Sequence, residues 1–175
     1  MFSIVPLNLH WLETMESAAD LCAHGGVELR LHGTTVHRSD GDDLAVSTGA
    51  LHLLRTLASP HTAERPLVEH LIPHCGHAMY VDTATREVQN MGCPHGSDWE
   101  VLHESDGVRL RLPAGPDLCL TDSDWCRAVT DFADRIEAFY DHSAPKQPRD
   151  DMDRQWYPLF WAEWHRRRSA APCAI

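Results

Sequence analysis

The antiparallel character of the fold is decided by residues 99–112, which read WEVLHESDGVRLRL. Apolar and polar side chains alternate on both sides of residues 105–107, Ser-Asp-Gly, a sequence typical of a tight turn. The stretch therefore predicts a β-hairpin with one buried face and one face in contact with water.

The same alternation recurs in other segments before residue 121. Val27, Leu29 and Leu31 alternate with polar residues and predict a further strand. Residues 78–81 and 88–91 flank a turn and predict a second hairpin. With shorter strands near residues 7–11 and 118–120, these segments predict an antiparallel meander of about six strands.

Helical periodicity predicts one helix before the hairpin at residues 78–91 and further helices after residue 120. Leucines at 51, 54 and 57 predict a helix near residues 47–58 that ends before Pro60. An apolar stripe steps by 4, 3, 4 and 3 residues from Trp125 to Phe139 and predicts a long helix that ends near Asp141. A last aromatic segment should begin, or be kinked, near Pro158.

These elements predict a single α+β domain over residues 1–175. Residues 1–120 are expected to be mostly β with one helix, and residues 121–168 are expected to form one or two helices. The helices are expected to pack together on one face of the antiparallel sheet.

The charge balance excludes some classes of partner. The chain carries 15 Lys+Arg against 26 Asp+Glu, a net charge of −11 with its 13 histidines neutral. Binding to nucleic acid or to an anionic membrane surface needs clustered basic residues, so neither is expected. The sequence has no long apolar run and no basic, signal-like N-terminus, which predicts a cytoplasmic protein whose six cysteines are thiols.

Cysteine and histidine recur as Cys-x-His triplets at residues 22–24, 75–77 and 93–95, each beside a glycine. Thiolate and imidazole are ligands of structural Zn²⁺, so Cys75, His77, Cys93 and His95 form a candidate zinc site at the two ends of one hairpin. A thiolate at Cys93, activated by a neighbouring histidine, is a second possibility. With so many histidines, chance is the simpler explanation, and the chain has no Cys-x-x-Cys, so we expect no cofactor.

The C-terminal segment is unusually rich in aromatic residues, with five between positions 156 and 164. One interpretation is that this helix packs on the rest of the domain. The other is that some of the rings remain exposed and dock a protein partner, since such rings dominate binding hot spots. The candidate partner-binding residues are Trp156, Tyr157, Trp161 and Trp164.

The usual short catalytic motifs for nucleotide binding, serine hydrolysis and zinc proteolysis are missing from the sequence. The favoured function is therefore a non-enzymatic interaction protein, such as an adaptor or an immunity-like protein, that binds a protein partner. The alternative is a metal- or thiol-dependent enzyme that uses the Cys-x-His turns.

Several segments taken together resemble a family of short bacterial cytosolic proteins with a Gly-Cys-Pro-Asn-Gly-like turn followed by Asp-Trp. The resemblance is carried mainly by residues 92–101, GCPHGSDWEV, and also by residues 20–25, 70–76, 143–148 and 160–164. It implies no activity. Here His95 stands where the family has Asn, which implies that a metal ligand at position 95 is not a family property.

Overall fold

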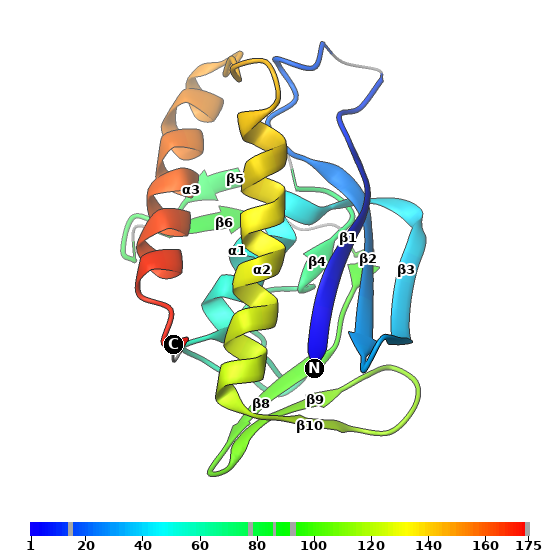
Figure 1. The fold of residues 1–175 in the computed structure, drawn as a ribbon. Helices are drawn as coiled ribbons and strands as arrows, with labels where there is room; N and C mark the ends of the chain where they lie inside the picture. Colours follow the sequence, from blue (N-terminus) through cyan, green and yellow to red (C-terminus); the bar gives the residue numbers. More distant parts are fainter. Residues whose placement is uncertain (14–15, 77–78, 86, 92–93, 174–175) are drawn as a thin grey trace.

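The computed structural model describes residues 1–13, 16–76, 79–85, 87–91 and 94–173, with only the backbone described at 40–42. The strands are β1 (Phe2–His10), β2 (His24–Leu31), β3 (Thr34–Ala45), β4 (Ile72–Pro73), β5 (Met79–Val81), β6 (Val88–Asn90), β7 (Gly96–Ser97), β8 (Glu100–Glu104), β9 (Gly107–Arg111) and β10 (Leu118–Leu120). The helices of this described part are α1 (Val46–Thr56), α2 (Asp122–Asp141) and α3 (Asp151–Ser169) (Figure 1).

The strands form several small antiparallel sheets. One has the order β1-β2-β3 and another β10-β9-β8, and the pairs β4–β7 and β5–β6 stand apart. The class α+β is thus confirmed, whereas the single six-stranded meander is wrong. The predicted hairpins exist as β5–β6 and β8–β9, but they belong to separate sheets and do not pair with each other.

The helices do not share one face of a sheet, which corrects the expected packing. Helix α1 lies in the middle of the molecule, and all eleven of its residues are buried. Helix α2 packs against β1 and α1, whereas α3 packs against β5, β6 and α1. In Figure 1 the α2 and α3 ribbons run side by side in front of α1.

The polar side chains of α1 are buried because other elements supply their hydrogen-bond partners. Ser47 Oγ accepts from the Ala23 amide at 3.0 Å, and Thr48 Oγ1 donates to the Gly76 carbonyl at 3.2 Å. A buried polar group without such a partner would cost free energy, so these contacts fix the position of the helix.

Arg55 of α1 forms a buried ion pair with Glu163 of α3. Its Nε and Nη2 atoms donate to the two carboxylate oxygens at 2.9 and 3.0 Å. Glu163 also accepts from the Val88 amide and from Arg167 Nε. Burial disfavours the charged carboxylate, but Arg55, Arg167 and the Val88 amide together outweigh burial and hold the pKa of Glu163 below its usual value.

Helix α2 begins where its sequence predicts. The Thr121 hydroxyl accepts from the Asp124 amide at 3.0 Å and caps the helix. The predicted stripe is buried, from Trp125 through Phe132 to Ile136.

Helix α3 begins earlier than the position of Pro158 suggests. Asp150 caps it by accepting from the Asp153 amide, and Pro158 lies inside the helix. Pro158 is exposed, so its ring lies on the solvent side of the helix.

Two of the six cysteines are not thiols, which corrects the expectation from sequence. Cys126 of α2 and Cys173, after α3, form a disulfide across 47 residues of sequence, with their Cα atoms 5.4 Å apart. The antiparallel course of α2 and α3 returns the C-terminal end of α3 to the start of α2, and the spacing of the two cysteines in the sequence does not reveal this proximity.

None of the helices in the described ranges is long and apolar enough to cross a bilayer.

Candidate functional site

Two of the four zinc candidates, His77 and Cys93, lie outside the described residues. Cys75 is partly buried, and its Sγ atom lies 3.3 Å from His74 Nδ1. The His74 amide donates to the His95 carbonyl at 2.9 Å, so the two turns are neighbours. Within the described ranges, no three His, Cys, Asp or Glu side chains are grouped to hold a metal ion.

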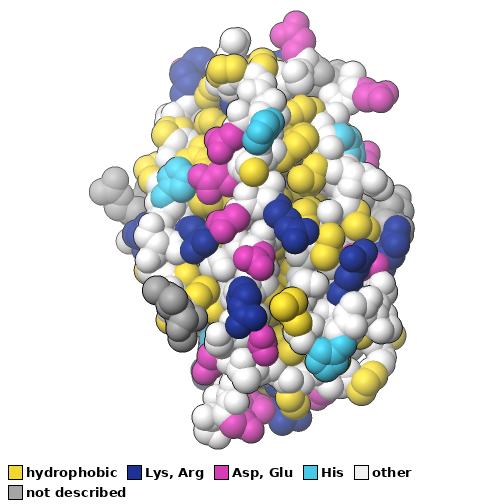
Figure 2. All heavy atoms as spheres, viewed as in Figure 1, with side chains coloured by type: hydrophobic (Ala, Val, Ile, Leu, Met, Phe, Trp, Pro, Cys, Tyr) yellow, Lys and Arg dark blue, Asp and Glu magenta, His cyan; other side chains and the backbone are white. Residues whose placement is uncertain are grey.

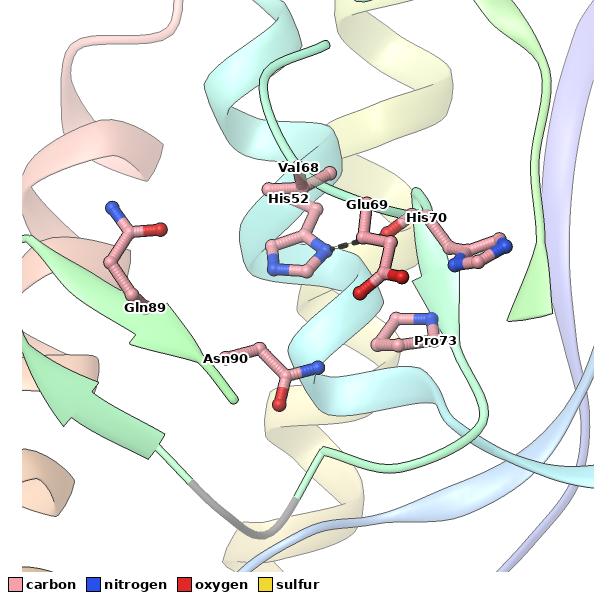
Figure 3. A pocket seen from close by; sticks show the side chains of 7 residues that line it. All are labelled: His52, Val68, Glu69, His70, Pro73, Gln89 and Asn90. Atoms are coloured by element: carbon pink, nitrogen blue, oxygen red, sulfur yellow. Dashed lines mark hydrogen bonds between the residues drawn. The ribbon is translucent and has the colours of Figure 1, made fainter. Parts of the chain in front are cut away.

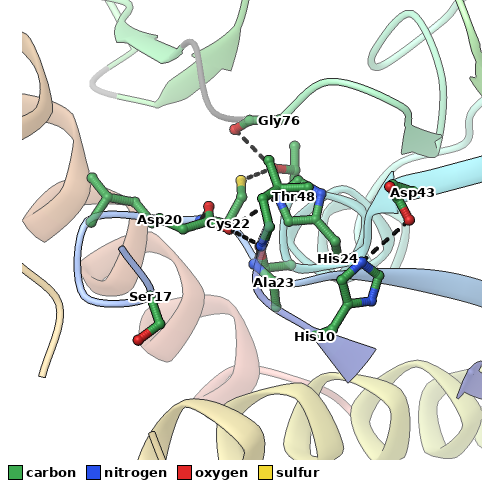
Figure 4. Close-up of polar contacts among 12 residues, drawn as sticks. His10, Ser17, Asp20, Cys22, Ala23, His24, Asp43, Thr48 and Gly76 are labelled. Carbon is green, nitrogen blue, oxygen red and sulfur yellow. Dashed lines mark hydrogen bonds and ion pairs between the residues drawn. The ribbon is translucent and has the colours of Figure 1, made fainter. Parts of the chain in front are cut away.

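The first Cys-x-His turn is buried beside the N-terminal end of α1 (Figure 4). Cys22 Sγ lies 3.5 Å from Thr48 Oγ1, and burial raises the pKa of its thiol to about 11. Asp20 accepts from the Leu12 amide at 2.8 Å and lies 3.5 Å from His24 Nε2. A thiol with a raised pKa is a poor nucleophile at neutral pH, so this turn is suited to packing rather than to thiolate chemistry.

A small polar cavity lies between α1 and β6 (Figure 3). Its volume is about 60 Å³, and His52, His70, Gln89 and Asn90 are among its lining residues. His52 Nδ1 lies 3.0 Å from the His70 carbonyl. Burial, together with the nearby charge of Arg55, lowers the pKa of His52 to about 3, so its ring is neutral. A cavity of this size does not accommodate an organic substrate.

The structure separates the four aromatic candidates into two pairs. Trp156 and Trp164 are buried in the core, so their assignment as partner-binding residues is corrected. They lie on the helix face that carries Phe160 and packs inward. Tyr157 and Trp161 are only partly buried, because they lie beside that face.

Tyr157 and Trp161 line an open cavity of about 220 Å³, which we call the aromatic pocket. It lies where α2 ends, between that end, residues 142–150 and α3; this is the upper part of Figure 1. Its titratable and aromatic lining residues are Glu137, Tyr140, Asp141, Lys146, Tyr157, Trp161 and His165. The members outside α3 were not predicted from the sequence.

Tyr140 fixes the floor of the aromatic pocket. Its hydroxyl donates to the Leu21 carbonyl at 2.8 Å and accepts from the Ala23 amide at 3.0 Å. Burial raises the pKa of Tyr140 well above its usual value, so the phenol stays neutral. Its ring meets those of Trp11 and Trp161 edge-on, with centroids 4.9 and 5.0 Å apart. The floor is therefore rigid and preorganised.

The segment between α2 and α3 is attached to the loop before β2. The Lys146 ammonium lies over the ring of Trp11, 2.8 Å from its centroid, and donates to the Ser17 carbonyl at 2.6 Å. The Gln147 amide donates to the Ala18 carbonyl at 2.7 Å. Burial lowers the pKa of Lys146 to about 8. These contacts hold one wall of the aromatic pocket in place.

Carboxylates lie along the side of the aromatic pocket formed by α2. Glu137 accepts from Trp164 Nε1 at 3.0 Å and lies 2.8 Å from His165 Nε2. Asp141 is exposed, and its carboxylate has no hydrogen bond or ion pair with any residue of the described ranges. Figure 2 shows acidic, basic and histidine side chains interleaved over the front of the molecule, where α2 and α3 lie side by side.

Two histidines elsewhere contact groups that are common in catalysis. His61 Nε2 lies 3.1 Å from Asp98, and His61 Nδ1 accepts from the Leu67 amide at 3.1 Å. His37 Nε2 lies 2.8 Å from the buried Ser97 hydroxyl. None of these side chains lines the cavities described above, and their hydrogen bonds join neighbouring loops and strands.

Comparison of the chain with protein-family models, with curated proteins and with solved structures finds no match.

Proposed function

We propose that this chain is a non-enzymatic interaction protein, of the adaptor or immunity-like kind, that binds a basic segment of a protein partner at the aromatic pocket. The observation that carries this proposal is the partial exposure of Tyr157 and Trp161 in an open cavity beside the carboxylates Glu137 and Asp141. Partly buried aromatic side chains with a polar rim are typical of binding hot spots.

The charge of the chain favours a basic partner. The net charge is −11, and helix α2 carries acidic side chains from Asp122 to Asp141. Complementary charge raises the rate of association and disfavours acidic partners. The neutral aromatic floor would then supply the short-range contact area that charge alone does not.

The described polar groups give less support to an enzyme. The thiol of Cys22 has a raised pKa, and the buried His52 is neutral beside a cavity of about 60 Å³. Neither group combines a reactive protonation state with room for a substrate, which acid–base or nucleophilic catalysis requires.

A metal- or thiol-dependent enzyme remains the second candidate because of one contact. His74 Nδ1 lies 3.3 Å from Cys75 Sγ, within reach for activating the thiol. This candidate predicts that Cys75 reacts with iodoacetamide near neutral pH much faster than the exposed Cys119 on β10, or that untagged protein carries stoichiometric metal. Equal thiol rates and less than about a tenth of an equivalent of metal would remove it.

The interaction proposal is tested by selecting binders from a library of displayed peptides. We expect basic peptides to be enriched, and we expect Trp161→Ala to weaken their binding about tenfold or more. Tyr80→Ala is the matched control, since Tyr80 lies on β5 and is 48% exposed. Enrichment without basic character, or equal binding by the two variants, would contradict the proposal.

A charge variant separates loss of folding from loss of binding. Asp141→Lys changes an exposed side chain without a partner among the described residues, so it should leave the stability of the fold nearly unchanged. It should, however, weaken the binding of basic peptides. Asp106→Lys makes the same change of charge in the turn between β8 and β9 and should have little effect on binding.

A further inference from the structure

Three rings that line the aromatic pocket contact one another edge-on. Trp161 meets Tyr140 at 86° and Tyr157 at 88°, with centroids 5.0 and 6.4 Å apart. The faces of aromatic rings carry negative electrostatic potential, and several faces around one cavity attract a cation. A cavity of about 220 Å³ is smaller than most sites for drug-sized ligands and is suited to one long side chain.

The end of α2 adds further negative potential at this position. A helix C-terminus carries a partial negative charge, which basic side chains usually balance. The last turn of α2 has no basic residue, and Glu137 and Asp141 lie there instead. Glu137 is engaged by Trp164 Nε1 and His165 Nε2, so Asp141 is the carboxylate that a cation bound at this helix end would meet.

The one lysine of the pocket does not occupy this place. The ammonium of Lys146 lies over Trp11 and donates to the Ser17 carbonyl, so its charge is engaged on the side of the loop before β2. The carboxylate of Asp141 has no partner in the described part of the chain. A second cation can therefore be accommodated at the rim without breaking an ion pair.

We propose that the aromatic pocket receives one arginine side chain of the partner, in contact with the part of Trp161 that His165 does not cover and paired with the carboxylate of Asp141. A guanidinium fits this combination better than an ammonium, because it is planar, stacks on rings and donates to a carboxylate at the same time. The proposal deepens the proposed function by naming the anchoring side chain of the basic segment.

The test uses Nα-acetyl-arginine amide and its citrulline analogue, in which a neutral urea group replaces the guanidinium at nearly the same size. Each compound is titrated into the full chain, and the indole NMR signal of Trp161 is followed. We expect saturable binding of the arginine compound, about fivefold or more tighter than that of the citrulline compound. Asp141→Asn should reduce this preference, whereas Asp106→Asn should not.

The possible outcomes separate this inference from the proposed function. Equal binding of both compounds would show a pocket that does not select for the positive charge, and failure of both to perturb Trp161 would show no side-chain site. Either result overturns the inference even if basic peptides bind elsewhere. Arginine-selective binding that Asp141→Asn weakens would support it even if the peptide selection finds no partner.

Discussion

Glu163→Gln is expected to lower the free energy of unfolding by about 3 kcal/mol at pH 7. The carboxylate accepts from Arg55 Nε and Nη2, from the Val88 amide and from Arg167 Nε. Glutamine keeps one acceptor oxygen but turns an amide donor toward Arg55, whose side chain is 5% exposed. The penalty is mainly that of a buried guanidinium without its counter-charge.

The assay is urea denaturation at pH 7, with calorimetry as a second measurement. For a chain of this length, a loss of about 3 kcal/mol corresponds to a decrease in Tm of roughly 6–12 °C. Asp134→Asn is the control, since it removes the exposed ion pair with Arg168 and should cost less than about 1 kcal/mol. A Glu163→Gln effect no larger than that of the control would refute the role given to the buried pair.

The pH dependence provides an independent check. The folded-state pKa of Glu163 is lowered, so the unfolded carboxyl group binds a proton more readily than the folded one. Its contribution to stability is therefore fully present above the ordinary pKa of glutamate and is lost as the pH falls through the folded-state pKa. The stability difference between the wild type and Glu163→Gln should shrink in acid. A constant difference down to pH 3 would contradict this sign.

Three further predictions concern stability. Reducing the Cys126–Cys173 disulfide frees a segment of 47 residues and should lower the free energy of unfolding by about 4 kcal/mol on a chain-entropy basis. The urea midpoint should fall accordingly, and an unchanged midpoint would disprove the prediction. The pKa of His52 is lowered to about 3, so the free energy of unfolding should decrease as the pH falls from 6.5, by up to about 1.4 kcal/mol per pH unit. A His52→Gln variant with the same pH dependence would count against this. Gly107→Ala places a Cβ atom 2.1 Å from the Leu120 carbonyl oxygen, whereas the Cβ atom of Gly115→Ala meets nothing within 4 Å. Gly107→Ala should therefore lower Tm clearly more than Gly115→Ala, and equal Tm values would argue against the clash.

Elements with one wet face were predictable from the sequence. The stripe from Trp125 to Ile136 and the hairpin at residues 99–112 display their periodicity because water contacts their other side. Helix α1 was anticipated only through its leucines. Its His52 and Arg55 look like surface residues, but the His70 carbonyl and Glu163 satisfy them inside the protein. No local pattern reveals partners so distant in sequence.

The candidate site was predictable only in part, for a similar reason. The aromatic arc from Trp156 to Trp164 was evident, but packing against the rest of the protein determined that Tyr157 and Trp161 stay accessible. Tyr140 and Lys146 join them because the segment between α2 and α3 folds onto the loop before β2. The contact between this segment and the loop depends on the tertiary structure. The disulfide across 47 residues likewise depends on how α2 and α3 pack, so neither could be predicted from local sequence.

The single lysine gives this protein a practical advantage for chemical labelling. Apart from the N-terminal amine, Lys146 is the one amino group that an amine-selective cross-linker can modify. Its pKa of about 8 leaves more of the reactive uncharged form at neutral pH than an ordinary lysine has. Because Lys146 lies on the wall of the aromatic pocket, a short cross-linker attached there would mark which residues of a bound partner lie next to the pocket.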